Sequence, residues 1–214
     1  MNCGLGNLFT LKAHLQGIAL ADETRLDDVI QAIGLGVAAQ MENFCDRKLP
    51  RVVGDTFVSP ADRASFILPR YPVETVTLIE FKADETSGWV SGAGNVPAVQ
   101  SLSGPSGLVY LGDGADPGKY WSQVRFTFTG GYWFETLEPT DDGFPSTLPA
   151  GAAALPADLL LAWLTQCRRV WSAFDKLGTK ITDNSQAASA ALAALDWTPE
   201  SREILARYRR MTLI

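Results

Sequence analysis

The sequence predicts an α+β protein: mainly an α-helical bundle, with a small antiparallel β unit inserted into it and a C-terminal helical arm. Two observations predict the core. Apolar residues recur at three- and four-residue steps over 24–45 and 156–177, and the period changes to two over about 55–134. A third predicts the arm, because a last helical pattern follows an Ala/Ser-rich stretch. We therefore expect a core over 1–178 and a flexible spacer with a terminal helix over 179–214.

The N-terminal part predicts two helices. TLKAHLQG, at 10–17, suits a short amphipathic helix, and a long helix follows over 24–45. Thr24 and Asp27 have the spacing of a capping box. Two glycines, Gly34 and Gly36, interrupt the long helix, and each costs about 1 kcal/mol relative to Ala. They mark either a weak point or the close approach of a neighbouring helix.

The β unit begins with short strands and a corner set by proline. In FILPRYPVETVTLIEF, at 66–81, Pro69 and Pro72 prevent one strand from running through, so we expect a strand, a rigid corner and a second strand. QVRFTFTGGYW has the clearest alternation, with Val124, Phe126 and Phe128 on one face. Residues 84–107 are rich in turn formers and predict a long hairpin. Glu74 and Glu80 fall within predicted strands, and the sequence names no partner for either.

An acidic insertion and a second long helix follow. The insertion, 135–155, carries four acids and no base, so we expect it to be exposed. The helix starts at Pro156, which suits a first turn, and runs to about Phe174, within the 156–177 stretch. Its apolar face consists of Leu160, Trp163, Leu164, Cys167, Val170, Trp171 and Phe174.

The terminal helix begins at WTPE, where Thr198 is the expected cap and Pro199 the first helical residue. It is amphipathic and basic: three arginines and no acid fall within 204–214. The apolar side holds Ile204, Leu205, Tyr208 and Met211, and the other side holds Arg202, Arg207, Arg209 and Arg210. Such a helix is either a docking arm for a partner or a solvated helix packed on its own domain.

Composition excludes several function classes. The net charge of −6 makes the chain a poor clamp for DNA, because phosphate binding depends on basic side chains. No run of about 18 apolar residues predicts a membrane span, and MNCGLGNLFTLKAH lacks the pattern of a secretion signal. The three cysteines, an odd number lying far apart, predict reduced thiols in a cytosolic setting.

The residues of catalysis and metal binding do not form a recognisable set. His14 is the single histidine, which argues against a metal site with two imidazoles and against a Ser/His/Asp triad. GDGADPGKY, at 112–120, has the wrong spacing for a phosphate loop, with Asp113 in the place of its first glycine and Tyr120 in the place of the magnesium-binding Ser or Thr. Two pairs of aspartates, Asp113 with Asp116 and Asp141 with Asp142, supply too few ligands for a calcium loop. We therefore predict no enzyme activity, no cofactor and no metal.

The order of motifs resembles the head–tail connector (adaptor) proteins of long-tailed bacteriophages. TLKAHLQ, a helix from LDDVIQAI to ENFCDRKL, the LPRYPVETVTLIEF strand pair, VRFTFTGGYW and LPADLLLAWLTQCRRVW follow one another as in that family, over about 10–177. The matching positions are Phe44 and Arg47, then Leu68, Pro72, Val73 and Val76, then Thr129, Gly130, Gly131 and Tyr132, then Leu155, Pro156 and Asp158. The regions 84–121 and 135–155 are longer than the family needs, and 179–214 matches no family motif.

The resemblance implies a structural protein of the virion neck, made in the host cytoplasm. It would form a ring, dodecameric in this family, under the portal protein. The ring would extend the DNA channel and join the capsid to the stopper or tail-completion protein, while its acidic surface lets DNA slide past without sequence-specific binding. We further predict that 198–214 docks on the portal through Ile204, Leu205, Tyr208 and Met211, with Arg202, Arg207, Arg209 and Arg210 facing acids there.

Two alternatives remain open at this stage. One is another neck or tail component, such as a stopper or a tail terminator, which would be richer in β-structure. The other is a carbohydrate-binding β-module or hydrolase, suggested by Trp89, Trp121 and Trp133 near strand ends; such tryptophans are more often part of a core.

Overall fold

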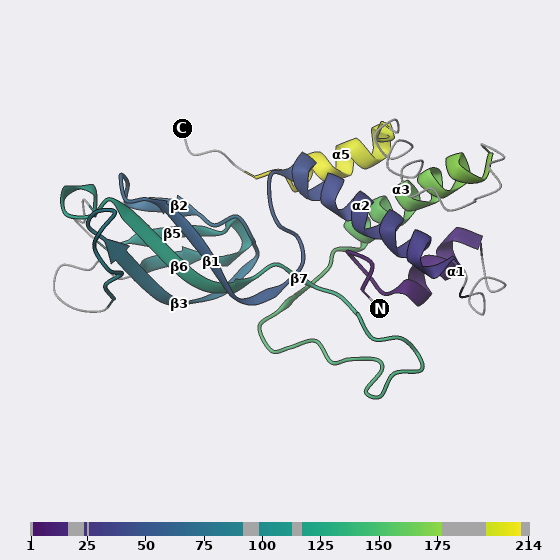
Figure 1. Cartoon of the computed structure of the whole chain (residues 1–214), viewed down its shortest axis with the longest axis horizontal. Coiled ribbons are helices and arrows are strands. Elements are labelled where there is room, and N and C mark those ends of the chain that lie inside the picture. Colours follow the sequence, from purple (N-terminus) through teal and green to yellow (C-terminus); the bar gives the residue numbers. More distant parts are fainter. Residues whose placement is uncertain are drawn as a thin grey trace. The chain divides into compact units, whose positions relative to one another are not determined.

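The chain folds into two compact units. The computed structural model describes residues 2–16, 24, 26–91, 99–112, 117–176 and 196–210. The helical unit comprises Met1–Asp46, Trp133–Pro149 and Ala154–Arg209. The β unit comprises Arg47–Tyr132 with Ala150–Ala153 and Arg210–Ile214. Figure 1 shows the helices and the strands that make up each unit.

The helical unit contains α1 (Leu8–Gln16), α2 (Asp27–Cys45), α3 (Ala157–Lys176) and α5 (Pro199–Arg207). The helices pack through a mainly apolar core, to which most apolar positions at helical spacing contribute and in which the polar Gln166 is also buried. Apolar members of this core with no exposed surface are Cys3, Leu5, Leu11, Ile30, Ile33, Val37, Met41, Cys45, Leu159, Trp163, Cys167 and Leu205. Phe174 falls among residues whose side chains lie outside the described part.

The start of α2 differs from the prediction. The helix begins at Asp27, its N-cap is Leu26, and no side chain caps it. Thr24 contributes only its backbone carbonyl, which accepts a bond from Asp27 N at 3.1 Å. The Asp27 carboxylate instead pairs with Lys12 Nζ of α1 at 2.7 Å. The predicted capping box is therefore wrong, because a contact with another helix takes the acidic side chain.

Gly34 resolves the choice that the sequence left open for that position. A Cβ there would lie 2.5 Å from the backbone oxygen of Cys3 and 2.9 Å from Leu11 Cδ2. The Gly34 carbonyl also accepts a hydrogen bond from Trp163 Nε1 of α3 at 3.0 Å. Gly34 thus marks a close approach, of the N-terminal segment on one side and of α3 on the other.

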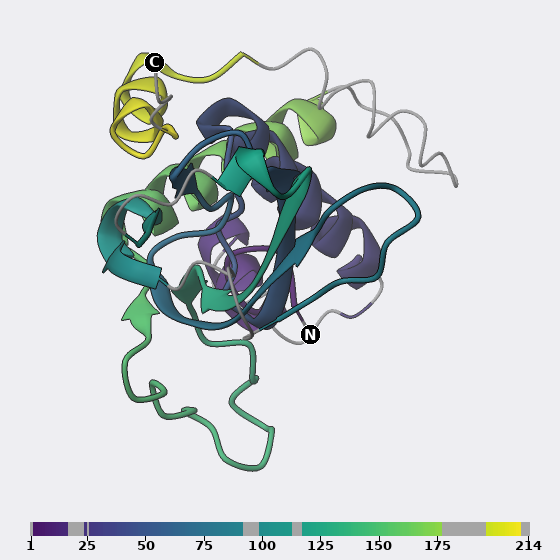
Figure 2. The same ribbon diagram turned by 90° about the vertical axis from the view of Figure 1, so that its left-hand side faces the viewer.

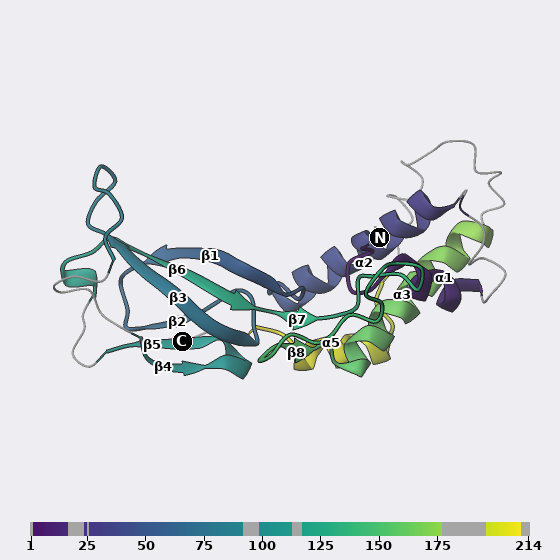
Figure 3. The ribbon, with the colours of Figure 1, turned by 90° about the horizontal axis from the view of Figure 1, so that it is seen from below.

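The β unit consists of two three-stranded antiparallel sheets. One has the order β1 (Val52–Pro60), β6 (Gln123–Gly130), β3 (Val73–Lys82); the other has the order β2 (Ser65–Ile67), β5 (Leu108–Leu111), β4 (Val99–Ser103). Figure 3 shows the two sheets as separate layers. Short helical turns η2 (Gly104–Ser106) and η3 (Pro117–Lys119) connect strands, and β7 (Tyr132–Trp133) pairs with β8 (Ala153–Ala154).

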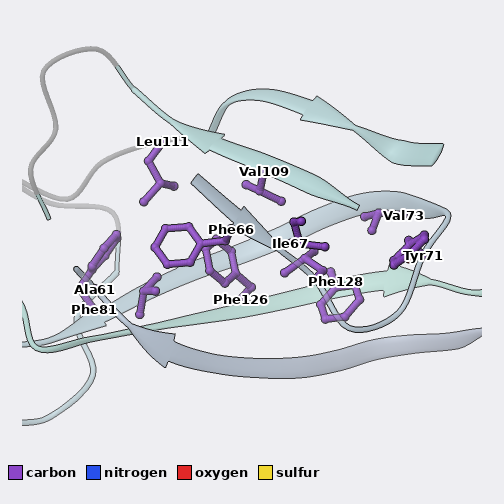
Figure 4. Close-up of a cluster of buried hydrophobic side chains, with 12 residues drawn as sticks. Ala61, Phe66, Ile67, Tyr71, Val73, Phe81, Val109, Leu111, Phe126 and Phe128 are labelled. Carbon is purple, nitrogen blue, oxygen red and sulfur yellow. The ribbon is translucent and has the colours of Figure 1, made fainter. Parts of the chain in front are cut away.

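The two sheets enclose an aromatic core of their own, shown in Figure 4. The predicted alternation of β6 is confirmed, since Val124, Phe126 and Phe128 are all fully buried. The rings of Phe66 and Phe126 lie 5.1 Å apart at an angle of 54°. The structure therefore combines helices and antiparallel sheets in two units, and it does not clearly support the description as mainly a helical bundle.

The proline corner joins β2 to β3, as the sequence predicted. Its backbone is tied down on both sides: Lys48 N donates to Pro69 O at 2.8 Å, and Gly131 N donates to Pro72 O at 2.8 Å. Arg70 within the corner donates to Asp55 Oδ2 at 2.6 Å and also to Pro50 O. Arg70, which precedes Tyr71 in the corner, thus fastens the corner to β1.

Tyr71 packs its ring against Arg47. The Arg47 guanidinium carbon lies 3.4 Å from the Tyr71 ring centre and 5.3 Å from that of Tyr132. The strand acids also have arginine partners. Arg51 binds Glu74 through two bonds of 2.6 and 2.9 Å, and Arg125 binds Glu80 at 2.7 Å.

Candidate functional site

The terminal helix α5 is capped as the sequence predicted. Thr198 Oγ1 accepts a hydrogen bond from Ser201 N at 3.0 Å, and Pro199 occupies the first turn. Its apolar side faces the helical unit. Leu205 has no exposed surface, and its carbonyl accepts from Cys45 Sγ of α2 at 3.6 Å.

Further contacts fix both ends of α5 to the same unit. Before the helix, Arg169 of α3 donates to Asp196 O at 2.9 Å, and Trp197 packs edge-on against Phe44 of α2. After it, the Tyr208 hydroxyl donates to Asp158 Oδ1 of α3 at 2.7 Å. The described part of the tail is therefore a helix packed on its own chain. The predicted spacer at 179–196 lies outside the described residues except for its last position.

These contacts change which predicted residues are available to a partner. Leu205 of the predicted docking set lies in the core of its own unit, where its side chain is covered by its own chain. Ile204, Tyr208 and Arg210 are half-buried, and Arg210 donates to Ile67 O of the β unit at 2.6 Å. Met211 lies outside the described residues. Docking of this segment on a portal protein stays a prediction.

The exposed residues of α5 and of the segment just after it carry both charges, with arginines in excess. Arg202, Arg207 and Arg209 are exposed, as are Glu200 and Glu203; we call the three arginines the arginine face. Arg207 pairs with Glu203 at 2.8 Å, one helical turn away. Within the described chain, neither Arg202 nor Arg209 has a carboxylate partner among the ion pairs.

A second surface is formed by residues 134–149, which follow β7 and which we call the acidic loop. It is long for a connection without regular structure, and such loops in compact domains are usually functional. Glu135 organises it, since its carboxylate accepts from Leu137 N at 2.9 Å, Ser146 N at 2.6 Å and Ser146 Oγ at 2.7 Å. These bonds hold the pKa of Glu135 below its usual value, against the opposing effect of desolvation, which is the largest single contribution.

The acidic loop is anchored to the helical unit and exposes both acids and apolar groups. Asn7 Nδ2 donates to Leu137 O at 2.5 Å. Beyond that anchor, Asp141 and Asp142 are exposed, and the side chains of Phe144 and Leu148 are 40% and 43% exposed. The sequence predicted the exposure of this insertion but gave no signal for its internal hydrogen bonds.

The residues considered for chemistry are not brought together. No group of three or more His, Cys, Asp and Glu side chains in the described chain could hold a metal ion. The three cysteines are free and buried, and burial raises the pKa of Cys3 to about 11. Burial, helped by the charge of Arg168, lowers the pKa of His14. Residues 113–116 of the glycine-rich segment lie outside the described part.

The tryptophans do not form a platform for a sugar. All six are buried or half-buried. Trp89 stacks on the Arg125 guanidinium at 4.5 Å, and Trp121 packs against Phe81 at 5.7 Å between ring centres. Among the described helices, none is long and apolar enough to cross a membrane.

Comparison with known proteins finds similarity in structure alone. No family model matches the chain, and no curated protein matches it in sequence. A chain in the neck of an empty GTA particle computed with C6 symmetry superposes with a TM-score of 0.58 at 17% identity, covering 100% of this chain and 93% of that one. The chain shares the fold of a gene transfer agent neck chain.

A second solved structure leads to the same statement about fold. It is the virion of a native gene transfer agent particle, of which one chain superposes with a TM-score of 0.55 at 14% identity. That match covers 100% of this chain and 94% of the other. The likeness therefore includes both units of the chain and leaves no large part of the neighbour unmatched.

Proposed function

We propose that this chain is a structural protein of the neck of a phage-like particle, and not an enzyme. The observation that carries the proposal is the match in fold to a neck chain, which covers 100% of this chain and 93% of that one. The protein would be located in the virion, between the capsid portal and the tail.

At finer detail, we propose that the chain is a head–tail adaptor that forms a ring under the portal. The motif order of the sequence supports this, and the neck neighbour was computed with C6 symmetry, which a closed ring of twelve copies satisfies. The partners would be other copies of the chain, the portal protein, and a stopper or tail-completion protein. A net charge of −6 per copy favours a channel past which DNA slides.

Native mass spectrometry of the purified chain, alone and mixed with the portal protein of the same particle, tests this function. We expect a single closed ring to add to the portal assembly. A persistent monomer with no affinity for the portal would contradict the adaptor role and leave only the fold in common with neck proteins. A ring that binds a tail tube in place of the portal would instead indicate a tail terminator.

A further inference from the structure

The arginine face of α5 and the acidic loop carry opposite charges on one unit. The loop holds Glu135, Glu138, Asp141 and Asp142 without a basic residue. The arginine face offers Arg202 and Arg209, both exposed and neither engaged in a described ion pair. Opposite charges of this kind favour association when they meet across an interface.

The two surfaces lie on opposite sides of the helical unit. In Figure 1, α5 borders the unit on one side of α2 and α3, while the acidic loop extends away on the other side. Figure 2, turned by 90°, shows the same separation. The loop of a chain therefore cannot reach the arginine face of the same chain, and the complement of each surface has to come from another molecule.

Complementary patches on opposite sides of a molecule make a head-to-tail contact. Such a contact repeats from copy to copy and generates a ring when the rotation closes. Exposed Phe144 and Leu148 beside Asp141 and Asp142 would give the contact an apolar centre with a charged rim, which is the usual anatomy of a protein interface.

We propose that neighbouring copies of this chain bind each other through the acidic loop of one and the arginine face of the next. The proposal rests on the proposed ring and adds the surfaces that hold it together. It also assigns the arginines of α5 to a neighbouring copy in place of the portal.

Two charge-reversal variants of the full chain test the pairing. The loop variant is Glu138→Lys with Asp141→Lys and Asp142→Lys, which leaves Glu135 as the loop's one acid, and the helix variant is Arg202→Glu with Arg209→Glu. In the loop variant both surfaces are positive, and in the helix variant both are negative, so each variant alone repels itself. Mixed in equal amounts, the two should alternate around a ring, because every contact then joins a positive to a negative surface.

Native mass spectrometry and sedimentation velocity at low salt give the readout. We expect each variant alone to associate at least tenfold more weakly than the equimolar mixture, with rings in the mixture containing equal numbers of both variants. The difference should shrink as salt rises, since exposed charges are screened. Glu85→Lys, which changes an exposed acid in the β unit, is the charge control and should assemble as the wild type does.

Three results would overturn the proposal. Rings formed equally well by wild type and by each variant alone would show that copies join elsewhere, and the neck function would still stand. A mixture that associates no better than its components would show the same. Loss of portal binding in the helix variant but not in the loop variant would indicate that the arginines contact the portal.

Discussion

Replacing Gly34 by Ala should destabilise the helical unit, although Ala is the better helix former. The added Cβ would lie 2.5 Å from the Cys3 carbonyl oxygen, whereas ordinary contacts begin at 3.4 Å. The N-terminal segment, or α2 itself, must therefore retreat by roughly 1 Å, a displacement that a close-packed core resists. The obstacle is backbone, so no rotation of a flexible side chain relieves it.

The magnitude follows from three opposing contributions. Removing a glycine from a helix interior stabilises it by about 1 kcal/mol. Overpacking a tight core costs about 1–3 kcal/mol. Displacing α2 also weakens the bond between Trp163 Nε1 and the Gly34 carbonyl, which contributes about 1 kcal/mol. The net expected loss is about 2 kcal/mol, which corresponds to a fall in Tm of roughly 4–8 °C for a chain of this size.

Urea unfolding followed by circular dichroism at 222 nm measures this loss, because the described α-helices all belong to the helical unit. The midpoint should fall while the m-value stays constant. Gly36→Ala is the matched control: it makes the same change two residues away at a half-buried position, and we expect it to stabilise by up to about 1 kcal/mol. A Gly34→Ala protein as stable as the wild type would refute the close-approach argument.

Three further predictions concern single contacts. Glu74→Gln should cost about 2 kcal/mol of β-unit stability in urea unfolding, since it leaves Arg51 without its charged partner; no change would mean that the pair is not formed in solution. Tyr208→Phe should cost about 1 kcal/mol and increase hydrogen exchange in α5, whereas unchanged exchange would show that the hydroxyl does not hold the helix. Burial raises the pKa of Cys3 to about 11, and of Cys167 further, so the native thiols should resist a disulfide reagent at pH 8. Because the unfolded thiols ionise first, the unfolding midpoint should fall as pH rises from about 9 to 11; a flat profile would contradict burial of the thiols.

The sequence predicted correctly the elements that depend on neighbouring residues, such as strand β6 and the cap of α5. Val124, Phe126 and Phe128 alternate along the sequence, and their burial follows directly from strand geometry. The cap at Thr198 likewise depends only on the residues beside it.

Contacts between distant segments account for what the sequence did not predict. The start of α2 was missed because Asp27 pairs with Lys12 of another helix. The apolar side of α5 was recognised, but periodicity does not say whether Leu205 packs on its own chain or on another. Glu135 bonds to Ser146, eleven positions away, so the acidic composition of the loop predicted its exposure but not its internal hydrogen bonds.

The insertion of the β unit also bears on the order in which a growing chain can fold. The pairs of β6 with β1 and with β3 lie within Arg47–Tyr132. These strands can therefore pair as soon as β6 has left the ribosome. The helical unit depends on partners far apart, such as Gly34 and Trp163, which are separated by 129 positions. Closing such distant contacts is slow and comes late in synthesis. The arginine face that we propose for assembly therefore forms only after α5 has been made, which delays contacts between copies until each chain is nearly complete.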